Sequence, residues 1–144
     1  MGFSKASLRV AGLILGTICL QGCGPDPRSR FMDEVQGMIE LANAGQHGEL
    51  TDRISQPLRE KIRQEGWEES RALALAARRD REDAAQYQLL DVPRFSAKEY
   101  GEAEIRRTTR QGESRMVVPF WFEEKKWKAG AAYRDGRSWE AEGF

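Results

Sequence analysis

The stretch AEIRRTTRQGESRMVVPFWF, residues 103–122, decides the fold. Side chains of alternating character run from Glu102 to Arg110, which predicts a β-strand with Ala103 and Ile105 on one face. Gln111-Gly112 predicts a turn. The apolar run 116–122 then predicts a second strand that is covered on both faces. Pro119 has no amide proton to give to a neighbouring strand, so we expect a bulge or a sheet edge there.

Strand signals continue on both sides of this hairpin. Asp135-Gly136 separates two strand-like segments, 127–134 and 137–144. Asp-Gly favours the two-residue turn in which both residues have positive φ, so we expect a second hairpin. Residues 88–98 predict one more strand, an irregular one because Pro93 interrupts it. The total is four or five antiparallel strands.

Helical patterns precede the strands. Apolar residues recur at helical spacing from Phe31 to Ala42, with Ser29 as the expected N-cap and Gly45 as the stop. A second helical stripe follows Gly48 and reaches residue 62, with a restart or a kink at Ser55-Gln-Pro57.

A third helix is expected from about Trp67 to Gln86. Its charged residues, from Arg78 to Asp83, predict a solvated face with opposite charges in alternation. Helices followed by an antiparallel meander indicate an α+β fold, with two or three N-terminal helices packed on a curved sheet. We expect residues 31–144 to form this single domain.

The N-terminus predicts an export signal. Residues 1–9 are basic, and residues 10–20 are apolar but too few to span a bilayer comfortably. Leu20-Gln21-Gly22-Cys23 resembles the lipobox of bacterial lipoproteins. That resemblance implies cleavage between Gly22 and Cys23, a diacylglycerol on the Cys23 thiol, and a flexible tether over residues 23–30. An ordinary signal peptide or an uncleaved membrane anchor is the alternative.

The resemblance also implies a location. Gly24 stands where an inner-membrane retention signal would have Asp. We therefore expect a lipid-anchored protein of the bacterial envelope, held at the outer membrane and facing the periplasm.

Composition excludes several function classes. The chain has 23 basic and 23 acidic residues, and removal of residues 1–22 would take Lys5 and Arg9, leaving 21 against 23. This balance argues against nucleic-acid binding. Only Cys23 would remain of the two cysteines, so no disulfide framework is expected.

His47 is the single histidine, which excludes a zinc site with two imidazoles, and its Gly-rich surroundings predict an exposed loop residue. We expect no metal and no cofactor.

The predicted domain is similar to the nuclear-transport-factor-like, ketosteroid-isomerase-like α+β cone. The similarity rests on three segments, residues 42–45, 49–58 and 134–144, the last with a Gly-containing turn before a Trp. It implies a cone whose mouth holds a small apolar ligand, and it is compatible with a homodimer formed through the sheets. Enzymes of this family place Asp, His or Tyr inside the cone, but no position here matches their active-site motifs.

Two sets of candidate residues follow. Asp91 has apolar neighbours at 89, 90 and 92, so it is the carboxylate best placed to serve as a buried general base, with Tyr87 or Tyr100 beside it. An exposed position before Pro93 is the alternative. The aromatic side chains of Trp121, Tyr133 and Trp139 are candidates for binding a ligand or partner. Core and sheet packing is the alternative for them.

Three functions remain open. The first is a non-enzymatic, membrane-anchored binding module for a small apolar ligand or an envelope protein. The second is an enzyme of the isomerase or dehydratase kind, with Asp91 as its base. The third is a structural accessory of an envelope secretion or assembly complex.

Overall fold

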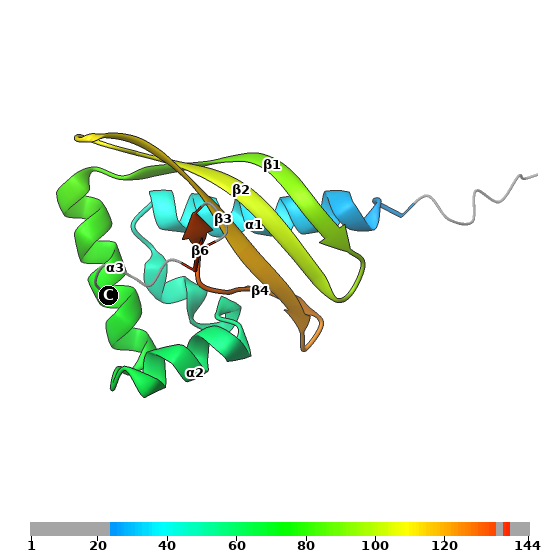
Figure 1. Ribbon diagram of the computed structural model, residues 1–144, viewed down its shortest axis with the longest axis horizontal. Helices are drawn as coiled ribbons and strands as arrows, with labels where there is room; N and C mark the ends of the chain where they lie inside the picture. Colours follow the sequence, from blue (N-terminus) through cyan, green and yellow to red (C-terminus); the bar gives the residue numbers. More distant parts are fainter. Residues whose placement is uncertain (1–23, 135–136, 139–144) are drawn as a thin grey trace, which may run out of the picture.

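The computed structural model describes residues 24–134 and 137–138. The helices are α1 (Pro27–Asn43), the 3-10 helix η1 (His47–Arg53), α2 (Gln56–Gln64) and α3 (Glu69–Asp83). The strands are β1 (Gln86–Ser96), β2 (Tyr100–Thr109), β3 (Gly112–Glu123), β4 (Lys126–Ala129), β5 (Tyr133–Arg134) and β6 (Arg137–Ser138). Helices precede strands (Figure 1), so the α+β prediction is confirmed. None of the helices in these residues is long and apolar enough to cross a membrane.

The hairpin predicted from residues 103–122 forms the centre of the sheet. β2 and β3 are antiparallel and in register from Thr109 opposite Gly112 to Tyr100 opposite Trp121. β1 pairs with the free edge of β2, with register shifts between Leu89 and Arg94 where irregularity was expected. Strand order is β1-β2-β3-β5-β6, and β4 also pairs with β3.

Pro119 lies where β3 changes partners. Residues 120–123 pair with β4, whereas Val117 pairs with Tyr133 of β5. The Pro119 carbonyl accepts a hydrogen bond from the Gly130 amide at 2.7 Å, so this edge faces the connection between β4 and β5. A strand residue directs its amide and carbonyl to the same edge, so the missing proton costs no bond to β2.

The second hairpin has the expected register on each side of residues 135–136, which lie outside the described part of the chain. Arg134 pairs with Arg137, and Tyr133 pairs with Ser138, which leaves two residues in the loop.

Helix α1 begins earlier than predicted. Residues 27–30, expected to belong to the tether, are helical, and the N-cap is Asp26 rather than Ser29. The Asp26 carboxylate accepts from the Ser29 amide at 3.3 Å. Proline at the first helical position loses no intrahelical bond, since that amide has no partner in any helix. Pro27 is therefore suited to the start of this helix, and Pro25 lies just before the N-cap.

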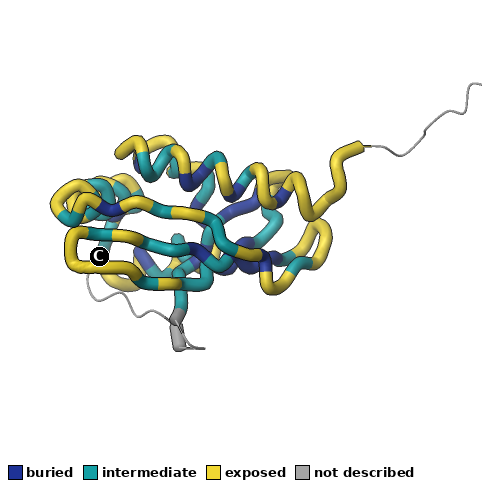
Figure 2. The backbone as a smooth tube through the Cα atoms, turned by 90° about the horizontal axis from the view of Figure 1, so that it is seen from above, coloured by how far each residue is buried: buried dark blue, intermediate teal, exposed yellow. Residues whose placement is uncertain are grey.

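The main core lies between α1 and one face of the sheet. Phe31 is 0% exposed, and its ring lies 4.7–5.5 Å from the rings of Phe95, Phe120 and Trp127. The buried positions of α1 recur at about one per turn (Figure 2), which confirms the predicted stripe. On β2 and β3 alternate residues face this core.

The remaining helices lie on the same side of the sheet as α1 (Figure 1). The expected restart near Pro57 is confirmed, because η1 ends at Arg53 and α2 begins at Gln56. The Gln56 amide donates to the Glu123 carboxylate at 3.1 Å, which satisfies one free amide of α2 and places a negative charge at its N-terminus. The third helix is shorter than predicted and ends at Asp83, before the strand signal starts.

Candidate functional site

A cavity of about 240 Å³ lies between the helices and the inner face of the sheet. Its walls are almost entirely apolar and come from α1, η1, α2, α3 and strands β1 to β4. They are formed by Val35, Met38, Ile39, Ala42, His47, Leu50, Arg53, Ile54, Leu58, Leu73, Ala76, Asp80, Tyr87, Ile105, Met116, Val118, Phe120 and Ala129. Small-molecule sites are concave and mostly apolar with a few polar groups, so this cavity is the candidate ligand site.

The polar part of this wall begins with His47. We predicted an exposed loop histidine, and that prediction is wrong: His47 is the first residue of η1 and is only 5% exposed. Its Nε2 lies 2.8 Å from Asp80 Oδ2. η1 packs closely on α3, which brings together two residues that are 33 positions apart in the chain. The Gly-rich sequence around His47 is typical of a loop, so the burial of this side chain could not be predicted from it.

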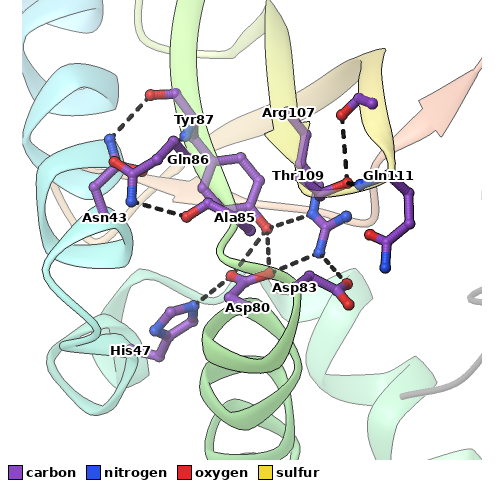
Figure 3. Close-up of polar contacts among 11 residues, drawn as sticks. Asn43, His47, Asp80, Asp83, Ala85, Gln86, Tyr87, Arg107, Thr109 and Gln111 are labelled. Carbon is purple, nitrogen blue, oxygen red and sulfur yellow. Dashed lines mark hydrogen bonds and ion pairs between the residues drawn. The ribbon is translucent and has the colours of Figure 1, made fainter.

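Asp80 is the centre of a hydrogen-bonded cluster (Figure 3). Its side chain is 12% exposed, although we predicted a solvated helix face. The Tyr87 hydroxyl donates to Oδ1 at 2.8 Å, and Arg107 donates to the same oxygen at 3.1 Å. Arg107 also donates to Asp83 at 2.9 Å. The charged run does contain a solvated pair, Arg78 with Glu82, but its two aspartates turn inward.

Tyr87 is fixed from a third direction by Asn43, the last residue of α1. The Asn43 amide nitrogen donates to the Tyr87 carbonyl at 2.9 Å, and its oxygen accepts from the Tyr87 amide at 2.7 Å (Figure 3). Burial raises the pKa of the Tyr87 phenol, and the Asp80 carboxylate raises it further, so the hydroxyl keeps its proton. α1, α3 and β1 are thus joined at the polar end of the cavity.

For one residue of the cluster, Arg107, the sequence does indicate a buried polar partner. Arg107 shares the inner face of β2 with Ala103 and Ile105, and a guanidinium among apolar residues requires a carboxylate partner. That requirement predicts an inward-facing acid on one of the helices. It does not say which one, since Asp80 and Asp83 both belong to a run that also contains exposed charges.

Asp91 is not part of the cavity. It is exposed, and its carboxylate accepts only from the adjacent Val92 amide at 2.7 Å among the contacts described. Asp91 pairs with Glu104, whose position on β2 lies on the face opposite Ala103 and Ile105. Of the two alternatives given for Asp91, the structure shows the exposed position and not the buried general base, because alternation along the strand directs Asp91 away from the helices.

Two of the aromatic candidates, Trp121 and Tyr133, lie on that opposite face as well. Trp121 follows the cavity residue Phe120 and packs edge-on against Tyr100, with ring centroids 5.4 Å apart. Gly130 leaves room for the indole, because a Cβ there would lie 2.2 Å from it. Tyr133 pairs with Val117 on the same face. Neither Trp121 nor Tyr133 lines the cavity, so packing explains Trp121. Trp139, Gly22 and Cys23 lie outside the described residues.

Among the residues that the structure describes, the outer face carries one buried acid. Glu102 is 5% exposed, accepts from the Tyr100 hydroxyl at 2.7 Å and lies 3.7 Å from the Arg94 guanidinium. Within residues 24–134 and 137–138, no group of three or more His, Cys, Asp or Glu side chains is placed to hold a metal ion.

Comparison with known proteins supports the fold. Neither a protein-family model nor a curated protein sequence matches this chain. Among solved structures, it is similar to an NTF2-like designed protein, a five-substitution variant titled Rd1NTF2_05. Identity is 11% and the TM-score is 0.51, over 74% of this chain and 97% of that one. The likeness concerns the fold alone, and it agrees with the nuclear-transport-factor-like cone expected from the sequence.

Proposed function

We propose that this chain is a membrane-anchored module of the bacterial envelope that binds a small apolar ligand between its helices and its sheet. The observation that carries the proposal is the cavity of about 240 Å³ with nearly continuous apolar walls. Binding an apolar molecule there removes apolar surface from water on both the ligand and the walls. An NTF2-like fold is compatible with this role.

Size limits the ligand. An apolar cavity of about 150 Å³ is large enough for benzene. The volume of the cavity here exceeds that value by roughly the volume of one further ring, so a two-ring hydrocarbon skeleton is the upper size that we expect.

Naphthalene is a suitable probe, and a matched pair of substitutions on α3 tests the site. Ala76 lines the cavity, whereas Ala74 on the same helix is exposed. Ala76→Leu should fill part of the space and weaken naphthalene binding by about tenfold or more, which corresponds to about 1.4 kcal/mol. Ala74→Leu should leave the affinity unchanged. Titration calorimetry measures both. Absence of naphthalene binding, or equal loss in the two variants, would refute the proposal.

The anchored location rests on the sequence. The basic start, the apolar run and Leu20-Gln-Gly-Cys23 agree with one another, and α1 begins only four residues after Cys23. A domain attached through so short a connection stays next to the bilayer. Cys23→Ser should abolish lipid attachment and release the protein from the membrane fraction, as measured by metabolic labelling with a fatty acid and by sedimentation. Unchanged labelling would refute lipidation at Cys23.

One observation favours a second candidate, an enzyme that transfers a proton. His47 and Asp80 form an imidazole–carboxylate pair in a wall that is almost entirely apolar, which is an arrangement suited to general base chemistry. Such an enzyme should accelerate exchange of the α-hydrogens of 2-tetralone, a two-ring ketone, in D2O. His47→Gln should abolish the acceleration, which NMR measures. Equal exchange with and without the protein would exclude this candidate for that substrate class.

A further inference from the structure

The contacts of Asp80 determine which nitrogen of His47 carries a proton. Tyr87 and Arg107 both donate to this carboxylate, and a carboxylate oxygen only accepts. The third neighbour, His47 Nε2 at 2.8 Å, must therefore also be a donor. In the neutral imidazole, Nδ1 is then left as an acceptor with a free lone pair.

That lone pair has no partner. His47 Nδ1 is buried, and no hydrogen-bond donor among the described residues lies within reach of it. A buried acceptor without a partner is unfavourable. Since His47 forms part of the cavity wall, a ligand in the cavity is the natural source of a donor.

We infer that the ligand is a neutral apolar molecule with one hydroxyl group that donates a hydrogen bond to His47 Nδ1. This inference depends on the proposed ligand-binding function and specifies the chemistry of the same site. The apolar body of the ligand fills the space between α1 and the sheet, and its hydroxyl lies at the His47 end. The hydroxyl needs a small adjustment of the neighbouring wall, because Nδ1 is covered in the unliganded structure.

The charges around the cavity favour a neutral ligand over an anion. Two carboxylates, Asp80 and Asp83, share the single guanidinium of Arg107. Arg53, the guanidinium that lines the cavity itself, is already paired with Glu34 at 2.6 Å. A ligand carboxylate would add a third negative charge beside Asp80 in an apolar setting, which is unfavourable.

Three ligands that share one two-ring body distinguish the contribution of the hydroxyl group from that of the rings. These are naphthalene, 2-naphthol and 2-methoxynaphthalene, whose ether oxygen cannot donate. The wild-type protein should bind 2-naphthol about tenfold more tightly than either of the others. His47→Phe keeps a ring in the wall but removes Nδ1, so it should bind all three within about twofold of one another. Naphthalene affinity in this variant reports whether the fold and the cavity are intact.

NMR of the imidazole nitrogens gives a second, direct readout in the full wild-type chain. Because His47 is the only histidine, its two nitrogen resonances need no assignment by mutation. The protein should show a proton on Nε2, and 2-naphthol should shift the Nδ1 resonance where naphthalene does not. A proton on Nδ1 in the free protein would overturn the inference.

The outcomes also separate the two proposals. Equal affinities for the three ligands would refute the hydroxyl donor while leaving the ligand-binding function intact. Tighter binding of 2-naphthoate than of 2-naphthol would overturn the neutral-ligand inference, because it would indicate a cationic His47. Failure of every ligand to bind would refute the proposed function itself.

Discussion

Gly101 of β2 lies against the ring of Phe31, the most buried large side chain of the core. A Cβ at this position would come within 2.8 Å of the Phe31 ring, and three surrounding aromatic rings limit how far that ring can move. Gly101→Ala should therefore lower the free energy of unfolding by about 1–3 kcal/mol through overpacking. Urea denaturation measures the change.

Gly37 provides the control for this substitution. It lies in the middle of α1, and a Cβ there would meet nothing within 4 Å. Gly37→Ala should stabilise the protein by about 0.5–1 kcal/mol, since alanine loses less backbone entropy in a helix. If both substitutions had the same sign, close contact with Phe31 would not be what requires glycine at position 101.

At the scale of elements, the C-terminal turn of α3 positions the residues of the polar cluster relative to one another. Ala84 adopts a left-handed conformation with φ of 52°. The Ala85 amide donates to the Asp80 carbonyl at 2.8 Å, and the Ala84 amide donates to the Arg81 carbonyl at 3.3 Å. These two bonds form a Schellman motif, in which glycine is the preferred residue. The motif reverses the chain so that β1 delivers Tyr87 back to Asp80.

Because alanine is strained in this conformation, Ala84→Gly should raise the free energy of unfolding by about 1 kcal/mol. The exposed mid-helix substitution Ala74→Gly is the matched control and should lower it by about 1 kcal/mol. Urea denaturation of both variants tests the motif. A loss of stability in Ala84→Gly would mean that the left-handed residue is not under strain.

Element boundaries show where sequence patterns are sufficient. The alternation on β2 and the apolar run of β3 both arise because one face of the sheet is buried. That burial leaves a pattern in the local sequence, and the pattern predicted both strands. The pattern after Gly48 was less informative, because apolar positions 50, 54, 58 and 62 fit one helix as well as η1 followed by α2. Pro57 indicated a restart or a kink between them, and a tertiary contact holds the break: the Ser55 amide donates to the Ala129 carbonyl at 2.9 Å. No local pattern encodes such a contact.

The candidate site belongs to the scale of the whole molecule. His47, Asp80, Tyr87 and Arg107 come from four elements, and any one of them has an ordinary local explanation. Their chemistry arises from the packing of η1 on α3 and of α3 against the start of β1. The single histidine and the inward Arg107 were visible in the sequence. Their common partner, Asp80, became apparent only from the fold.

All three tyrosines of the chain make the folded protein sensitive to alkali. Burial raises the pKa of Tyr87, Tyr100 and Tyr133, and a nearby carboxylate raises each further, Asp80 for Tyr87 and Glu102 for the other two. The unfolded chain releases these protons near pH 10. A raised pKa in the folded state means that the stabilisation is complete below pH 10 and is lost as the pH rises through the folded values.

The free energy of unfolding should therefore fall steadily above pH 10, and tyrosinate absorbance at 295 nm should appear together with the loss of circular dichroism. Tyr87→Phe should be less stable at pH 7 by about 1 kcal/mol, because a hydrogen bond to Asp80 is lost. Its stability should nevertheless decline less steeply above pH 10, since one proton fewer is released on unfolding. Ionisation of all three phenols near pH 10 in a protein that is still folded would contradict this coupling. The same result would contradict the burial of the Tyr87 hydroxyl at the end of the cavity, because a phenol that ionises freely beside Asp80 must be in contact with solvent.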